Sequence, residues 1–225
     1  MLANKYKLVL ANNKRADARK QLLEKERKEM NKDTKKLTGK DLINVGIYSA
    51  IMFVVVFAAA MLGMIPIGYP ALTVIVPLIG GIVFILFLTK VSKFGMIWIM
   101  SLIMGVMMLL TGMGIYPFLV SIFSGGITEL IIRSGNYASR KKAVIANGTF
   151  FMWVWGNYFL LYFNRAEFLA SRAESVGTEF TEAIDRLLPM WTCPVLLLIC
   201  IVSGILGGLL GTSMLKKHLK KAGIA

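Results

Sequence analysis

Residues 35–64 read KKLTGKDLINVGIYSAIMFVVVFAAAMLGM, in which a basic stretch passes into 24 residues that carry a single charge, on Asp41. A run of this length and composition can cross a hydrocarbon core ~30 Å thick as an α-helix. Five further apolar runs follow, at about residues 71–88, 94–111, 115–132, 144–163 and 189–215. None has the alternation of a membrane β-barrel strand. The sequence therefore predicts an all-α membrane protein, a bundle of six transmembrane helices over residues 41–215.

The basic residues predict how this bundle is oriented. Of the 26 Lys and Arg residues, 13 lie within residues 1–40, and 23 fall on one side of the membrane if there are six spans. Because basic residues are retained on the cytoplasmic side, we expect basic cytoplasmic tails over residues 1–40 and 216–225, and both termini in the cytoplasm. The polar loop 164–188 then lies outside.

Loop 164–188 carries the three remaining basic residues and five acidic ones. Its apolar residues recur at helical spacing, which predicts one or two short helices over the outer mouth of the bundle. These apolar residues are Phe168, Leu169, Val176, Phe180, Ile184 and Leu187.

The composition argues against several function classes. A net charge of +14 suggests nucleic acid for a soluble protein, but here it is better explained by basic loops that fix topology and lie against anionic lipid. There is no phosphate-binding loop, no His or Cys cluster and no nucleophile triad, so we expect no enzyme activity, no cofactor and no metal. Cys193 and Cys200 fall within one helix, too far apart to form a disulfide, and are expected to pack against the core or lipid.

The fifth apolar run is the most polar and aromatic of the six, and it predicts a binding site. Thr149, Trp153, Asn157 and Asn164 lie roughly on one helical face. An amide in hydrocarbon needs a partner, and for Trp153 and Asn157 both a ligand pocket and a helix–helix hydrogen bond remain open. Aromatic rings combined with amides suit a small planar, polar organic molecule. With the aromatic residues at the outer ends of other spans, the candidate substrate-binding residues are Trp153, Asn157, Tyr158, Asn164, Trp191, Tyr116 and Tyr69.

Small residues mark two candidate helix contacts. Gly46 and Ala50, four apart in the first run, would let another helix approach closely, either inside the bundle, which spacing alone favours, or as a docking stripe for a partner membrane subunit. The glycines of the sixth run, at 204, 207, 208 and 211, are expected to pack internally.

Glu129 lies four residues before Arg133, which favours an interfacial ion pair over a role in fixing the inner end of the bundle.

Several stretches resemble the substrate-binding S components of energy-coupling factor (ECF) vitamin transporters, and most closely the group called Trep_Strep or MptD-like. These stretches are Leu37–Ala60, Pro70–Lys93, Ser124-Gly125-Gly126-Ile127-Thr128-Glu129 and Gly135-Asn136-Tyr137, and the resemblance extends from about Lys36 to the C-terminus. Gly46 and Ala50 take the place of the family's A-x-x-x-A stripe, with Gly in the first position.

The resemblance implies a multi-pass protein of the bacterial plasma (inner) membrane that captures a vitamin or precursor-like small molecule at an outer pocket. It would deliver this substrate inward together with a T-type membrane subunit and two ABC ATPases, which supply the energy. The stripe would contact the T subunit. The alternative from the residues alone is a standalone facilitator, channel or membrane assembly protein.

Overall fold

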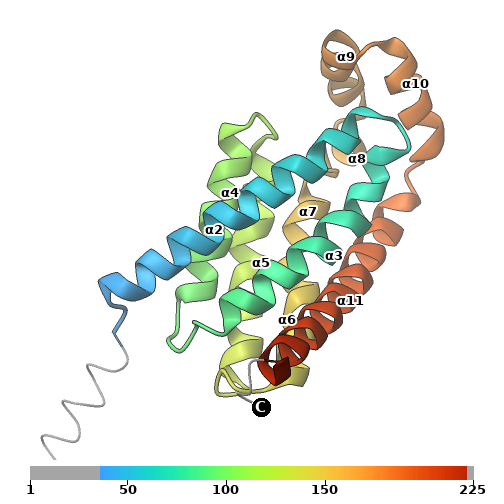
Figure 1. Cartoon of the computed structure of the whole chain (residues 1–225). Coiled ribbons are helices and arrows are strands. Elements are labelled where there is room, and N and C mark those ends of the chain that lie inside the picture. The colour runs from blue at the N-terminus through green and yellow to red at the C-terminus, as the bar shows by residue number, and fades with distance from the viewer. Residues whose placement is uncertain (1–35, 222–225) are drawn as a thin grey trace, which may run out of the picture. The chain divides into compact units, whose positions relative to one another are not determined.

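The computed structural model describes residues 36–221, so the predicted tail over residues 1–40 lies almost entirely outside the described residues. The described residues are α-helical with one short 3₁₀ helix and contain no strand. The elements are α2 (Gly39–Ala60), η1 (Met61–Met64), α3 (Gly68–Leu88), α4 (Met96–Leu110), α5 (Ile115–Arg133), α6 (Arg140–Phe150), α7 (Met152–Gly156), α8 (Phe159–Phe163), α9 (Arg165–Val176), α10 (Thr178–Leu187) and α11 (Thr192–Lys221) (Figure 1). The predicted all-α class is confirmed for this part of the chain.

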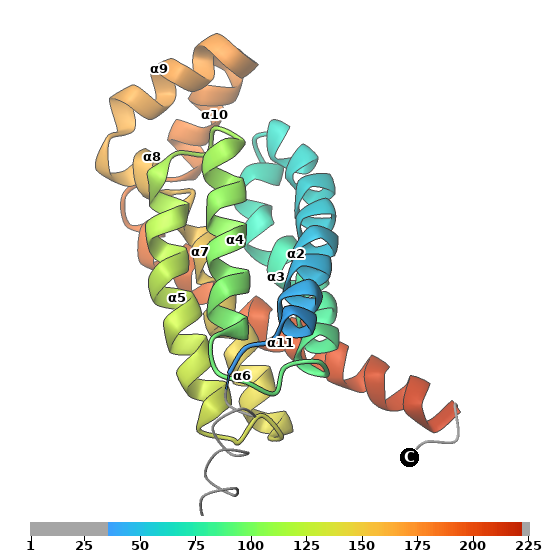
Figure 2. The ribbon, with the colours of Figure 1, turned by 90° about the vertical axis from the view of Figure 1, so that its left-hand side faces the viewer.

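Within residues 36–221, four helical segments are long and apolar enough to cross a membrane: Gly39–Met64, Gly68–Leu88, Ile115–Arg133 and Thr192–Lys217. The third predicted span corresponds to α4, which has 15 residues and is therefore about 22 Å long at ~1.5 Å per residue. It lies beside α5 along most of its length (Figure 2). The count of six spans stays a prediction.

The fifth predicted span is not the continuous helix that the apolar run indicates. It is divided into α6, α7 and α8, with interruptions at Phe151 and at Asn157–Tyr158. Backbone groups released at such interruptions need new partners inside a membrane protein. The Cys200 thiol donates to the Phe151 carbonyl (3.2 Å), and the Tyr69 hydroxyl donates to that of Asn157 (3.4 Å). Hydropathy cannot detect these interruptions, because the partners come from other helices.

Helix α11 packs most extensively against α3 and α6, and its glycines make this close approach possible. A Cβ on Gly204 would stand 2.7 Å from the Gly148 Cα of α6, and one on Gly211 would stand 3.0 Å from the Gly81 carbonyl oxygen of α3. The expectation that the glycines of the sixth run pack internally is confirmed.

Helix α2 has one buried and one exposed face. The buried face consists of Val45, Ser49, Met52, Val56 and Ala59, which recur every three or four residues. At the start of the helix, the Asp41 carboxylate accepts a hydrogen bond from the Thr38 backbone N–H and pairs with Lys93 at 2.8 Å. This ion pair joins the start of α2 to the turn between α3 and α4.

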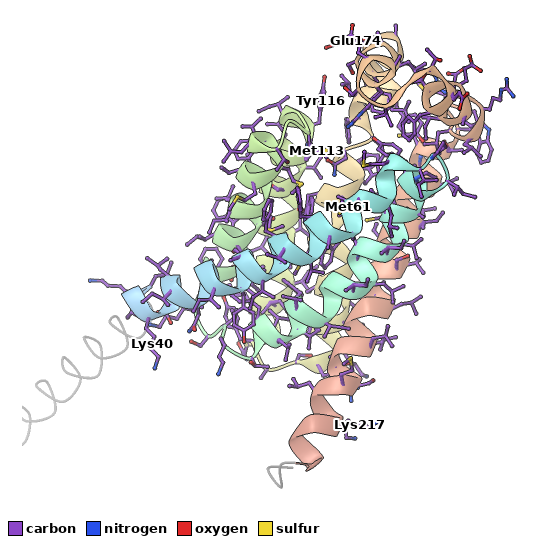
Figure 3. The ribbon with its side chains drawn as sticks, turned by 45° about the horizontal axis from the view of Figure 1, so that its top comes forward. Lys40, Met61, Met113, Tyr116, Glu174 and Lys217 are labelled. Atoms are coloured by element: carbon purple, nitrogen blue, oxygen red, sulfur yellow. The ribbon has the colours of Figure 1, made fainter. Side chains whose placement is uncertain are left out.

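The two ends of the helix bundle differ in charge. Lys40 and Lys217 lie at one end, whereas Glu174 lies at the other, on α9 (Figure 3). Helices α9 and α10 lie together at this second end, which we call the α9–α10 end (Figure 1). The prediction of one or two short helices in loop 164–188 is confirmed, with two helices present. Of their apolar residues, Phe168, Phe180 and Ile184 are buried, whereas Leu187 is 46% exposed.

Candidate functional site

A cavity of about 150 Å³ lies under α9 and α10, and we call it the α9–α10 cavity. Its walls come from the end of α2 with η1, the start of α3, the end of α4, α7 with the residues that follow it, and the inner faces of α9 and α10. Segments far apart in the chain thus converge on one space. The α7 segment lies at the centre of the broken fifth span, and interrupted membrane helices commonly build binding sites in transporters.

The roof of the site is an aromatic cluster. The Tyr69 ring packs against Tyr158 with ring centroids 4.9 Å apart, against Phe168 at 5.9 Å and against Phe180 at 6.2 Å. The Tyr158 hydroxyl donates to the Tyr69 carbonyl (2.6 Å), which ties the α7–α8 turn to the start of α3. Burial of this cluster holds α9 and α10 on the bundle, because their other faces are polar.

Two buried polar atoms on the cavity-lining segment have no hydrogen-bond partner among the residues that the structure describes. Trp153 is 1% exposed and its Nε1 donates to nothing, while the Asn157 Oδ1 accepts from nothing; the Asn157 amide nitrogen donates to the Val154 carbonyl of its own segment (3.0 Å). An unpaired buried donor or acceptor costs roughly 1–3 kcal/mol. The sequence left open a ligand pocket or a helix–helix hydrogen bond for Trp153 and Asn157. Among the described residues neither of these two atoms makes a helix–helix hydrogen bond, and both residues line the cavity.

The predicted substrate-binding residues divide into two sets. Trp153, Asn157, Tyr158 and Tyr69 line the cavity together. The other three do not line it and occupy separate places: Asn164 donates to Glu167, Tyr116 stacks on Phe159 at 5.8 Å, and Trp191 is 68% exposed. Tyr116 lies at the start of α5 (Figure 3).

Sequence reasoning missed Arg172 as a cavity residue. Arg172 lies on α9 and lines the cavity with Val176, four residues later, and its guanidinium lies 5.7 Å from the Phe168 ring centroid. Phe168, Arg172 and Val176 are spaced i, i+4, i+8, so they share the face of α9 that turns inward. This spacing was the available signal, because it places a cation on an otherwise apolar helix face.

The interior between the cavity and the opposite end is filled with large side chains. Met52, Phe84, Phe87, Phe150 and Phe151 are 0% exposed, and the Phe84 and Phe150 rings stack at 4.3 Å. Below this packed layer, at the opposite end, lies a second cavity of about 380 Å³ between the ends of α3 and α11 and the start of α6. The α9–α10 cavity is thus separated from it by a close-packed core.

Gly46 and Ala50 lie on the exposed face of α2. A Cβ on Gly46 would meet no atom within 4 Å, and Ala50 is likewise exposed. Internal packing, which spacing alone favours for this pair, is therefore wrong for Gly46. The face continues with exposed Val54 and Phe57, at 66% and 56%.

Glu129 does not pair with Arg133. It is 0% exposed, and its Oε2 accepts from the backbone N–H groups of Ile97 (3.0 Å) and Trp98 (3.2 Å), while its Oε1 accepts from the Tyr137 hydroxyl (2.9 Å). It therefore caps the first turn of α4, which begins after Gly95 and has no capping side chain of its own. Arg133 is exposed and lies over the Phe94 ring, 5.1 Å from its centroid.

Together, the long apolar helices and the charge-separated ends define a multi-pass integral membrane protein. The family model described as "Hypothetical bacterial integral membrane protein (Trep_Strep)" matches residues 39–221, and the chain belongs to this family. The expected Trep_Strep membership is thereby confirmed. No curated protein and no solved structure matches the chain.

Proposed function

We propose that this protein is the substrate-binding S component of an ECF-type importer in the bacterial plasma membrane. It captures a small, vitamin-like or precursor-like molecule in the α9–α10 cavity, which faces outward, while both termini are cytoplasmic. A T-type membrane subunit and two ABC ATPases then supply the energy for inward delivery. The protein itself has no catalytic activity in this scheme.

The observation that carries the proposal is the exposed small-residue face at Gly46 and Ala50. Neighbouring helices occupy the space beside the glycines of α11, whereas no atom lies within 4 Å of a Cβ added at Gly46. Small residues on a lipid-facing helix allow another helix to approach at short distance. In the S components that the sequence resembles, the corresponding stripe contacts the T subunit.

The packed core favours a substrate-binding protein over a channel. A channel needs a continuous polar path, whereas the layer of Phe84, Phe87, Phe150 and Phe151 below the cavity is fully buried and apolar. A ligand in the α9–α10 cavity is separated from the opposite end by this packed layer, so its release there needs a large rearrangement of the bundle. A partner complex driven by ATP can supply that rearrangement.

Partner docking is tested by replacing both Gly46 and Ala50 with Leu. We expect the tagged wild-type protein, purified in mild detergent from its native membrane, to carry a T-type subunit and two ABC ATPases in mass spectrometry. The double variant should lose them without loss of thermal stability, because the new side chains extend into space that lipid occupies. Recovery of the wild-type protein alone, even after crosslinking, would support the standalone facilitator instead.

Gly126→Leu on α5 is the matched control for this experiment. Gly126 also has no atom within 4 Å of a Cβ, so the variant adds the same side chain to a different outward face. It should retain the partners. Loss of partners in both variants would show that extra bulk anywhere on the bundle prevents assembly.

Substrate binding is tested with Trp153→Phe, which keeps an aromatic ring and removes only the Nε1–H donor. We expect affinity for the compound released from the purified native protein to fall roughly tenfold, the equivalent of one lost hydrogen bond. Isothermal titration calorimetry measures this change. Trp191→Phe is the control, because Trp191 does not line the cavity. An unchanged affinity in Trp153→Phe would show that the Trp153 Nε1–H does not contact the ligand.

A further inference from the structure

We propose that the ligand of the α9–α10 cavity is a small organic monoanion with an apolar body, and that Arg172 pairs with its anionic group. This assignment rests on the proposed function only in that the cavity is taken to be a ligand site. It names the chemical class of the substrate, which neither the fold nor the family specifies.

The first observation is the surroundings of the Arg172 guanidinium. It is half-buried and lines the cavity beside Val176 and Phe180, and it is 3.9 Å from the Met113 sulfur. Within residues 36–217, whose side chains are described, the two ion pairs are Lys93–Asp41 and Arg165–Asp185, so Arg172 has no carboxylate within 4.0 Å. A guanidinium against apolar walls and a thioether lacks the strong acceptors it can bind.

The second observation is the chemistry of the neighbouring α9 and α10 residues. Of their acidic side chains, Asp185 is held by Arg165 and Glu167 accepts from Asn164. Glu174, Glu179 and Glu182 are exposed and do not line the cavity. The described residues therefore supply no internal counter-ion to the cavity wall. A carboxylate on a ligand can take this place, with the two parallel hydrogen bonds that arginine favours.

The third observation is the α7 segment on the cavity wall. The Trp153 Nε1–H and the Asn157 Oδ1 are one free donor and one free acceptor, and the remaining lining of η1, α3 and α4 is largely apolar. These groups suit a neutral polar substituent on a mainly hydrocarbon molecule. The volume of about 150 Å³ holds roughly one benzene-sized ring with a small substituent. One cation in so small a space favours one negative charge, because a second would remain unpaired.

The experiment uses the full-length protein in detergent and three probes of similar size that differ in charge, the anion benzoate, the neutral benzamide and the cation benzylamine, each at roughly 10 mM. We expect benzoate to raise the melting temperature by about 3 °C, and benzamide and benzylamine by less than a third of that. Arg172→Gln should abolish the benzoate shift, and Arg172→Lys should retain part of it. Ala60→Phe, which fills the cavity from α2, should abolish every shift while the helical circular dichroism spectrum is kept.

Arg186→Gln is the matched control, because Arg186 is exposed on α10 and makes the same charge change outside the cavity. It should leave the benzoate shift intact. An equal shift with benzamide, a benzoate shift that survives Arg172→Gln, or no shift with any probe would overturn the anion assignment. These results are independent of partner recovery. If a T subunit and ATPases co-purify but benzoate causes no shift, the importer proposal stands and the anion assignment fails. If benzoate causes a shift but those partners are absent, only the anion assignment stands.

Discussion

Gly207→Leu is expected to prevent correct assembly of the bundle, with a loss of about 3 kcal/mol or more in stability. Gly207 lies on α11 against α3, where an added Cβ would collide with the carbonyl oxygen of Pro77 and stand 2.9 Å from that of Leu78. These are backbone atoms of a helix that is itself packed on both sides, so they cannot move aside at low cost. We expect the melting temperature in detergent to fall by roughly 10 °C, or the protein to elute as aggregate in size-exclusion chromatography.

Gly207→Ala and Gly46→Leu are the controls for this experiment. The alanine variant adds only the Cβ and should show a smaller decrease of the same sign. The Gly46 variant adds a full leucine side chain on α2 and should be as stable as the wild type, because nothing lies within 4 Å. If Gly207→Leu were as stable as Gly46→Leu, this result would contradict the close contact between α11 and α3 at Gly207.

Glu129→Ala is expected to have the second-largest effect, a loss of about 3 kcal/mol. The substitution leaves the backbone N–H groups of Ile97 and Trp98 without their acceptor and removes the partner of the Tyr137 hydroxyl. Hydrogen bonds to a charged group contribute more than neutral ones, and a negative group at a helix N-terminus is further stabilised by the helix dipole. The melting temperature should fall by roughly 5–10 °C.

Conservative variants separate this capping role from a simple loss of volume. Glu129→Gln keeps one acceptor oxygen and should recover about half of the loss. Burial, reinforced by the hydrogen bond to Glu129, raises the pKa of Tyr137 well above its ordinary value, so its hydroxyl remains a donor at neutral pH, and Tyr137→Phe should cost about 1 kcal/mol. Arg133→Ala should be nearly neutral; a loss as large as that of Glu129→Ala would instead support the ion pair that spacing alone suggested.

Much of the fold could be predicted because the bilayer restricts the chain so strongly. Uninterrupted apolar runs such as 41–64 and 71–88 must be helical to satisfy their backbone in hydrocarbon, and the structure has α2 with η1 and α3 in these places. The apolar spacing of loop 164–188 likewise predicted α9 and α10. Four of the seven candidate substrate-binding residues line one cavity, because aromatic and amide side chains are rare enough within an apolar run to indicate where the helix is used for more than spanning.

The side of each helix that faces inward could not be read from the sequence. In a membrane protein both the lipid-facing and the core-facing residues are apolar, so Gly46 and Gly207 look alike in the sequence although one faces open space and the other a neighbouring backbone. The same holds for Glu129, which accepts from two backbone groups of α4, 31 and 32 residues away, and from Tyr137 rather than pairing with Arg133 on its own helix.

The division of the fifth span into α6, α7 and α8 also depends on distant partners, including the Cys200 thiol and the Tyr69 hydroxyl. The apolar segments and the separation of charge between the two ends could be predicted from the sequence, because they depend on local composition. The cavity, the capping of α4 and the exposed face of α2 could not be predicted, because each depends on contacts between segments that are distant in the chain.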